Sequence, residues 1–390
     1  MRPAARVQAA IEILDAVIAS AREGGAPADA LIRDYFRSRR YAGSKDRRAV
    51  RGLVYDAIRR HGDMPASGRA AMLGLAQDDP ELAAQFDGSE HGPAPIAPDE
   101  PILEASNAPQ WVKPLASNLV GDNDWPSFNQ RAPLDLRVNL ARTDREAMVS
   151  AFEGAELTPF SPMGLRLPTD SRVDDHAAYQ DGLVEVQDEA SQLVAMACRP
   201  ATGQRIVDFC AGAGGKSLAL AALAPEARII AADTDKRRLS ALGPRAERAG
   251  AAIETRLMNQ PNELAAFEDG IGRFDTVLVD APCSGSGTWR RSPELRWRLN
   301  PERLERLVGL QRDILDKAAQ LVRPGGTLVY AVCSIIEREG AAQAADFESR
   351  HSGWMVQDAL DVGRSDGPGR LLTPAHDGTD GFFIASWRKG

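Results

Sequence analysis

From residue 186 to the end of the chain, short and strongly apolar segments alternate with segments of helix length. Strands are predicted over residues 205–210, 228–233, 275–280 and 326–333, with a terminal edge strand over 381–387. Parallel strands need long crossover connections, which are usually helices. The alternation therefore predicts an α/β fold with a doubly wound, mostly parallel, Rossmann-like sheet, which binds its ligand at the carboxyl ends of the strands.

A glycine-rich loop, Asp208-Phe-Cys-Ala-Gly-Ala-Gly-Gly-Lys-Ser217, follows the first of these strands and opens a helix. Three kinds of nucleotide site begin in this way. A dinucleotide site requires a third glycine where Ser217 stands. A phosphate-binding P-loop would use Lys216 and Ser217 at its end, but Cys210 occupies the position of its first glycine. An acid at the strand end followed by Gly-x-Gly, here Asp208, Gly212 and Gly214, is typical of methyltransferases.

Asp233 ends the second strand, eighteen residues after Gly215. A carboxylate at this position can accept hydrogen bonds from both hydroxyl groups of an adenosine ribose, which an ATP P-loop site does not require. The simpler interpretation is that the glycines only close a turn and that Asp233 is a solvated strand end. The loop and Asp233 together favour an adenosine cofactor.

Two cysteines follow strand ends at the predicted ligand edge, in Asp280-Ala-Pro-Cys283-Ser-Gly-Ser-Gly287 and Tyr330-Ala-Val-Cys333-Ser334. A single buried cysteine is usually only a small apolar side chain. Two thiols beside an acid fit methylation of cytosine at C5, because a thiolate that adds to C6 makes C5 nucleophilic. Asp280 can then bind or protonate the N3/N4 edge of the base. The residues alone do not tell which thiol attacks.

The net charge of −8 and the pI of about 5.4 do not by themselves favour a nucleic-acid partner. The charge distribution is more informative, because residues 33–60 hold ten basic and three acidic side chains. A second basic stretch places Arg290, Arg291, Arg296 and Arg298 around Trp289 and Trp297. Each stretch could be a solvated helix face, but both suit phosphate contact. Trp297 could either stack on an unpaired base or pack in the core.

The four cysteines are widely spaced, form no Cys-x-x-Cys pair and are not grouped with the five histidines. We therefore expect no zinc or other metal site. No apolar run reaches the length of a bilayer span, and Glu12 and Asp15 interrupt the apolar character of the N-terminus, which is unlike a signal peptide. These features predict a cytoplasmic protein without a membrane partner.

The first part of the chain is predicted to be helical. Val7, Ile11, Leu14 and Ile18 form one helix face, and Ser44 is expected to cap a second helix. Residues 76–101 have the composition of a linker. A small α+β module follows, with a strand over 134–140 and a helix that runs from a Thr143–Glu146 capping box to Phe152.

Taken in order, the motifs DxCAxxGGK, DAPCSGxG and YxxCS, with the acid at Asp233, resemble the Sun (Fmu) family of RNA cytosine-5 methyltransferases, near its bacterial 16S ribosomal RNA type. Residues 186–192 and the Arg137-Val-Asn139 strand also match that family. The stretch 41–48 resembles its NusB-like helical domain. The resemblance implies four parts, which are a helical domain over 1–75, a linker with a connecting helix over 76–124, an RNA-binding α+β module over 125–185 and a methyltransferase domain over 186–390.

The resemblance also implies roles. Cys333 would be the nucleophile, Cys283 would assist product release, and Asp280 would face both the base and S-adenosylmethionine. Asp233 would hold the ribose of the cofactor, and Asn259, where the family has Asp, would contact its adenine. The rest of the cofactor would lie on Cys210, Ala211, Gly212, Ala213, Gly214, Gly215 and Lys216, where Ala213 replaces the usual proline.

The implied partner is RNA, most simply 16S ribosomal RNA, with transfer RNA as a second possibility. The RNA is expected to lie along Arg290, Arg291 and Trp297, with one cytosine flipped into the site. Two rival functions are a P-loop ATPase acting on RNA, which the missing first glycine disfavours, and a catalytically inactive RNA-binding assembly factor. The intact Cys283, Cys333 and Asp280 disfavour the second rival.

Overall fold

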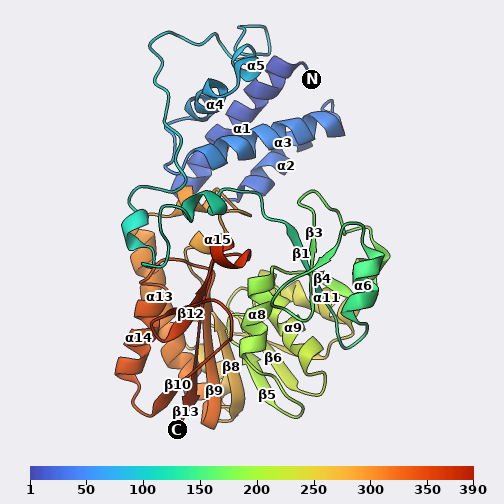
Figure 1. The fold of residues 1–390 in the computed structure, drawn as a ribbon, viewed down its shortest axis with the longest axis vertical. Coiled ribbons are helices and arrows are strands. Elements are labelled where there is room, and N and C mark those ends of the chain that lie inside the picture. The colour runs from blue at the N-terminus through green and yellow to red at the C-terminus, as the bar shows by residue number, and fades with distance from the viewer. The chain divides into compact units, whose positions relative to one another are not determined.

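The computed structural model describes residues 1–390 (Figure 1). The chain divides into two compact units. The helical unit comprises residues 1–115, 125–130 and 288–303, and the second unit comprises 116–124, 131–287 and 304–390. None of the helices combines the length and apolar character that a bilayer span requires.

The helical unit is built on α1 (Pro3–Glu23), whose predicted apolar face is confirmed, because Val7, Ile11, Leu14 and Ile18 are all buried. Gly43, and not Ser44, is the N-cap of the predicted second helix, and no side chain caps it. Ser44 is already its first helical residue, so its hydroxyl is not in the capping position. The other helices are α2 (Ala28–Arg37), α3 (Ser44–Arg60), α4 (Gly68–Gln77) and α5 (Pro80–Ala83), with 3-10 turns at Lys113–Leu115 and Trp125–Phe128.

The segment 288–303, expected within the methyltransferase domain, groups instead with the helical unit. Its short helix α12 (Leu295–Arg298) buries Trp297 among the apolar side chains of α1, α3 and α4. Trp297 is 5% exposed, and its Nε1–H donates to the carbonyl of His61 at 2.9 Å. The expectation that Trp297 stacks on an RNA base is therefore wrong, because its apolar ring and its single donor are both used inside the protein.

The small α+β module of the second unit is a four-stranded antiparallel sheet in the order β2-β3-β1-β4. The strands are β1 (Leu134–Val138), β2 (Glu156–Leu157), β3 (Gly164–Leu167) and β4 (Val184–Val186). Helix α6 (Arg145–Ala151) is capped by Asp144, which accepts the Ala147 N–H at 2.7 Å. The predicted Thr143–Glu146 capping box is wrong, because the acid one residue later takes the N-cap position. Helix α7 (Ala177–Gln180) precedes β4.

The α/β domain that follows has a nine-stranded mixed sheet, which confirms the predicted fold class. Its order is β11-β12-β13-β9-β8-β5-β6-β7, and β10 also pairs with β13. The parallel strands are β5 (Arg205–Asp208), β6 (Arg228–Asp233), β7 (Ile253–Leu257), β8 (Phe274–Asp280) and β9 (Val322–Val332). The antiparallel strands are β10 (Trp354–Gln357), β11 (Arg364–Asp366), β12 (Gly369–Leu372) and β13 (Phe382–Lys389).

Strand β13 is not the edge strand that the sequence predicted. It pairs with β9 on one side, and β12 and β10 cover successive parts of its other side. Its burial follows from this position, since six consecutive residues, 382–387, are buried. The edge strands are β11 and β10, which each have one partner, and the partly exposed strand β7 at the other end of the sheet.

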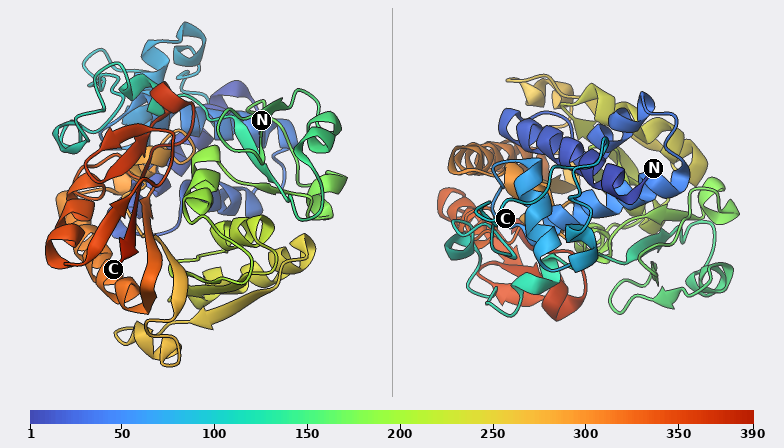
Figure 2. Two further views of the ribbon diagram at one scale, coloured as in Figure 1. Left: turned by 60° about the horizontal axis from the view of Figure 1, so that its bottom comes forward. Right: turned by 90° about the horizontal axis from the view of Figure 1, so that it is seen from above.

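Helices cover both faces of the sheet, as Figures 1 and 2 show, with α8 and α9 on the opposite side from α13 and α14. The core between α8, α9 and the sheet is rich in alanine, together with Leu, Ile, Val and Phe382, and the small side chains allow close packing. The helices are α8 (Glu189–Ala197), α9 (Gly215–Leu223), α10 (Lys236–Ser240), α11 (Leu242–Ala249), α13 (Pro301–Leu321), α14 (Ala341–Arg350) and α15 (Pro374–Asp377), with 3-10 turns at Glu263–Phe267 and Ser286–Thr288.

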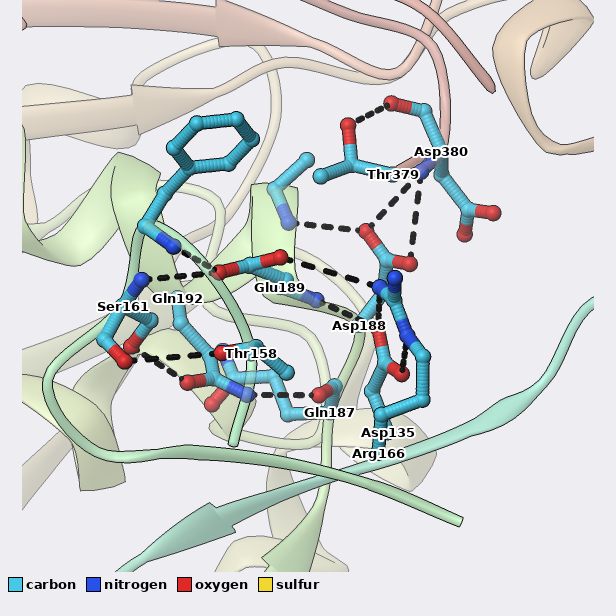
Figure 3. A network of polar contacts seen from close by, with 12 residues as sticks. Asp135, Thr158, Ser161, Arg166, Gln187, Asp188, Glu189, Gln192, Thr379 and Asp380 are labelled. Atoms are coloured by element: carbon cyan, nitrogen blue, oxygen red, sulfur yellow. Dashed lines mark hydrogen bonds and ion pairs between the residues drawn. The ribbon is translucent and has the colours of Figure 1, made fainter. Parts of the chain in front are cut away.

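A buried polar network joins the small module to the start of α8 (Figure 3). Arg166 of β3 donates from Nε and Nη2 to the two oxygens of Asp135 at 2.7 and 2.9 Å. Asp135 also accepts the backbone N–H of Glu189, and the Glu189 carboxylate accepts the N–H groups of Phe160 and Ser161, each at 2.7 Å. The module is thus tied to the α/β domain by charge-assisted hydrogen bonds, which have defined geometry.

Removing Asp135 should therefore destabilise the second unit. Asp135→Ala leaves the Arg166 guanidinium without its bidentate partner, and breaking a buried pair on one side costs about 3–5 kcal/mol. Urea unfolding followed by tryptophan fluorescence and circular dichroism measures this loss. The matched control is Asp170→Ala, since Asp170 is 93% exposed and its ion pair with Arg131 is 3.6 Å long. Equal unfolding midpoints for the two variants would contradict the assignment.

Candidate active site

The carboxyl ends of four neighbouring strands carry the predicted site residues. The strands lie in the order β9-β8-β5-β6, so that Cys333, Asp280, Asp208 and Asp233 follow one another along a single edge of the sheet. Register supports this arrangement, because Asp280 pairs with Ala331, two residues before Cys333. This edge is where doubly wound sheets bind their ligands.

The glycine-rich loop between β5 and α9 uses the conformational freedom of its glycines. Gly212 and Gly214 have φ angles of +56° and +80°, in the left-handed region that favours glycine. A Cβ on Gly214 would lie 2.2 Å from Cδ1 of Leu242, so a side chain there is also sterically excluded. The glycines are therefore required by both conformation and packing.

Asp233 lies beneath this loop and is 6% exposed. Its Oδ2 accepts the N–H of Gly212, and its Oδ1 accepts the N–H of Asp235, both at 2.7 Å. Each carboxylate oxygen has a further lone pair that can accept another hydrogen bond. A P-loop would turn its N–H groups toward a phosphate, whereas this loop directs the Gly212 N–H to a carboxylate, which disfavours an ATP site.

Asp208 is buried at the end of β5. Burial raises its pKa to about 7, although the Ser217 hydroxyl, which donates to Oδ2 at 2.7 Å, acts in the opposite direction. Its Oδ1 is buried and has no hydrogen-bond partner in the protein. Asp208 therefore offers one unused acceptor beneath the loop.

Lys216, at the start of α9, is buried and donates to Asp280 Oδ2 at 2.7 Å. Burial alone would lower the pKa of Lys216, but attraction to Asp280 and to other nearby acidic groups, Cys333 among them, raises it. Lys216 is thus a cation held by Asp280 and close enough to Cys333 to interact with it electrostatically. The ion pair of Lys216 with Asp280 is not visible in the sequence pattern, which predicted only that Lys216 belongs to the cofactor loop.

The Sγ atoms of Cys283 and Cys333 lie 3.3 Å apart, and both thiols are free and partly accessible. The hydrogen bond to Cys333 raises the pKa of Cys283 well above its usual value, and burial adds to this effect. Cys333, the partner of Cys283 in this hydrogen bond, lies near the Lys216 cation. Thiolates are stabilised in electropositive surroundings of this kind.

The other two cysteines differ. Burial raises the pKa of Cys210 well above its usual value and that of Cys198 above the physiological range. Cys198 lies in the core between α8 and the sheet, away from the strand ends. Neither has the environment of a nucleophile.

Asn259 follows β7, which pairs with β6 so that Leu257 lies opposite Asp233. The residue is exposed and lies at the same edge of the sheet as Asp233. The structure thus brings Asn259 close to Asp233 at the carboxyl ends of β6 and β7.

Sequence reasoning missed Glu339, which is 0% exposed beneath the two cysteine loops. It accepts hydrogen bonds from the serines that directly follow Cys283 and Cys333. The available signal was a serine after each cysteine and an acid six residues beyond Cys333. Glu339 directly follows two exposed charged residues, Glu337 and Arg338, so the sequence pattern gives no sign that it is buried.

Comparison with known proteins agrees with this geometry. The family described as 16S rRNA methyltransferase RsmB/F matches residues 195–388. The Ribosomal RNA small subunit methyltransferase B of Pectobacterium carotovorum subsp. carotovorum (strain PC1) is 35% identical over 285 residues, covering 68% of this chain and 63% of that protein. The same-named protein of Salmonella paratyphi B is 33% identical over 293 residues, covering 74% and 64%. The alignments thus span just under two thirds of these relatives.

Solved structures share the fold. The crystal structure of PH0851 has a TM-score of 0.78 at 23% identity, covering 98% of this chain and 99% of that one. A methyltransferase homolog protein from Pyrococcus horikoshii has a TM-score of 0.59 at 25% identity, covering 68% and 90%. The solved structures show the shared fold, and the sequence matches show that the chain belongs to the family described as 16S rRNA methyltransferase RsmB/F.

Proposed function

We propose that this protein transfers a methyl group from S-adenosylmethionine to C5 of a cytosine in 16S ribosomal RNA through a covalent cysteine adduct. The observation that carries the proposal is the pair of free thiols, Cys283 and Cys333, 3.3 Å apart at the ligand edge of the sheet. Family membership and the names of the relatives support the substrate class.

The residues present fit the cofactor. Asp233 has lone pairs free for the two ribose hydroxyls, and Asp208 Oδ1 is a buried acceptor without a partner. The loop 210–216 would hold the methionine and ribose parts, and Asn259 would lie toward the adenine. When bound, the cofactor supplies an electrophilic methyl group on a sulfonium. The acidic groups at this edge suit that positive charge.

Cys333 acts as the nucleophile. Its thiolate, stabilised by the nearby Lys216 cation, adds to C6 of the cytosine, and the electron pair of the C5–C6 double bond becomes available at C5 for methylation. Asp280, held as an ion pair by Lys216, accepts a hydrogen bond from the N4 amino group and so orients the base. The raised pKa of Cys283 supports this assignment.

Cys283 serves the second half of the reaction. Before addition, the Cys333 sulfur holds the pKa of Cys283 high. Once Cys333 is bound to C6 as a neutral thioether, that contribution disappears and Cys283 loses its proton more easily. The Cys283 thiolate can then remove the C5 proton, which restores the C5–C6 double bond and expels Cys333 as a thiolate.

The α2–α3 corner of the helical unit is the best-supported RNA contact. Tyr41 is 74% exposed there, next to exposed basic side chains. Two of these basic residues, Arg37 and Arg51, form ion pairs with Asp34 and Asp29, respectively. The remaining exposed basic residues are Arg33, Arg40, Lys45, Arg47 and Arg48. Basic side chains around an exposed aromatic ring suit a phosphate backbone with an unpaired base.

The cysteine roles predict opposite outcomes for two variants. Cys333→Ala should abolish turnover and form no covalent RNA adduct, because no thiolate adds to C6. Cys283→Ala should accumulate the adduct, because addition proceeds while elimination stalls. Denaturing gel electrophoresis of protein with labelled 16S RNA and S-adenosylmethionine measures both. An adduct that accumulates with Cys333→Ala would reverse the assignment.

Asp233→Asn should weaken S-adenosylmethionine binding. The charge-assisted hydrogen bonds to the ribose lose about 1.5–3 kcal/mol, which corresponds to an increase in Kd of about ten- to a hundred-fold. Isothermal titration calorimetry measures the change, with exposed Glu226→Gln as the control at the start of β6. An unchanged Kd for Asp233→Asn would remove Asp233 from the cofactor site.

The combined variant Arg40→Ala, Lys45→Ala and Arg48→Ala should bind 16S RNA more weakly. If each side chain neutralises one phosphate, the slope of log K against log salt concentration becomes less steep by about 2. Fluorescence anisotropy at several salt concentrations measures the slope, and Arg22→Ala, exposed in the same unit, is the control. A slope equal to that of the control would place the RNA elsewhere.

A further inference from the structure

Glu339 is a fully buried carboxylate that receives four hydrogen bonds from neutral donors. Oε1 accepts the backbone N–H of Ser284 at 2.8 Å and the side-chain N–H of Gln311 at 3.0 Å. Oε2 accepts the hydroxyl groups of Ser284 and Ser334, the latter at 2.6 Å. A buried charge is costly unless its lone pairs are used in this way.

These hydrogen bonds link the two cysteine loops through a single side chain. Ser284 directly follows Cys283 at the end of β8, and Ser334 directly follows Cys333 at the end of β9. The Ser286 hydroxyl adds a second bridge, since it lies 2.9 Å from Ser334 Oγ and accepts the N–H of Ile335 at 3.0 Å. Fixing the two serines fixes the backbone that carries both thiols.

The hydroxyl protons can be placed in one consistent way. Ser284 and Ser334 donate to the carboxylate, and Ser286 donates to Ser334. The arrangement requires a group that only accepts, which a carboxylate is and an amide is not. A glutamine of the same shape would present an N–H group to at least one donor and would also remove the buried negative charge.

We propose that Glu339 is a positioning residue that sets the spacing of the two thiols and keeps the proton on Cys283. Its negative charge adds to the effects that raise the pKa of Cys283, after the contribution of Cys333 and burial. The other titratable groups near the pair are Tyr330 from β9, whose hydroxyl donates to the Glu339 carbonyl, and Lys216 from α9, paired with Asp280 of β8. The role in catalysis rests on the proposed function, but the effect on the thiols does not.

Glu339→Gln tests the proposal without RNA or cofactor. Iodoacetamide labelling of each cysteine, quantified by peptide mass spectrometry between pH 6.5 and 9.5, reports the thiolate fraction at each position. In the unmodified protein Cys333 should label faster than Cys283. In Glu339→Gln the labelling rate of Cys283 should rise several-fold near pH 8, since each pKa unit changes the thiolate fraction about ten-fold. Exposed Glu337→Gln, on the same loop, should match the unmodified protein.

Ser334→Ala separates charge from attachment. This variant keeps the carboxylate and removes its attachment to the Cys333 loop, so the labelling rate of Cys283 should change less than in Glu339→Gln, while the thermal midpoint falls. A lower thermal midpoint for Glu339→Gln with unchanged cysteine labelling would overturn the proposal and leave Glu339 a merely structural residue. If Glu339→Gln does not fold, a Ser334→Ala variant in which both cysteines label at the rates of the Glu337→Gln control also overturns it.

Measuring RNA methylation alongside cysteine labelling distinguishes failure of the proposed function from failure of the positioning role. If the unmodified protein methylates RNA, Glu339→Gln should lower kcat at least about ten-fold with little change in KM for RNA, because the reacting groups and not the binding surface are displaced. If the unmodified protein methylates no RNA and the labelling contrast is present, the proposed function fails and the positioning role stands. If methylation occurs and the labelling contrast is absent, the positioning role fails alone.

Discussion

The parallel pairing of β8 with β9 is the constraint on which the site depends. It places Asp280 opposite Ala331, and the loops that leave the two strands then run side by side with their thiols 3.3 Å apart. Backbone pairing alone does not determine the conformation of the two cysteine loops. The buried carboxylate of Glu339 restrains them by accepting hydrogen bonds from a serine of each loop. The ion pair of Lys216 with Asp280 fixes an acidic side chain at the same edge. The proposed reaction needs two thiols and an acid around one base. Sheet register and one internal hydrogen-bond network hold these three side chains close together.

Much of this architecture follows from local patterns in the sequence. Apolar runs separated by helix-length segments correctly predicted β5, β6, β8 and β9, because strands buried on both faces have few alternatives. What failed depends on contacts between distant segments. The terminal strand β13 is internal because β10 and β12 pair with its outer side, and Trp297 is buried because its segment packs with the helical unit. The apolar pattern of β13 does not predict its strand partners, and that of α12 does not predict its packing in the helical unit.

The site shows the same division. The motifs led to the cysteines, Asp280 and Asp233, since each stands at a strand end beside a distinctive loop. Glu339 escaped notice because it lies beyond its strand among exposed charged residues, and only the fold shows that two separate serines converge on it. The network of Asp135, Arg166 and Glu189 in Figure 3 was equally hidden, since its members come from three separate segments. Buried polar networks are set by tertiary structure, and single-sequence patterns report them poorly.

The central claim is that this chain forms 5-methylcytidine in 16S ribosomal RNA. Purified protein incubated with unmodified 16S RNA and S-adenosylmethionine carrying a labelled methyl group, followed by digestion and nucleoside mass spectrometry, tests it directly. The account predicts labelled 5-methylcytidine at a single position, with the label on carbon 5. Absence of any labelled nucleoside under conditions where the protein binds both S-adenosylmethionine and RNA, or a label on a nitrogen or ribose oxygen, would contradict it.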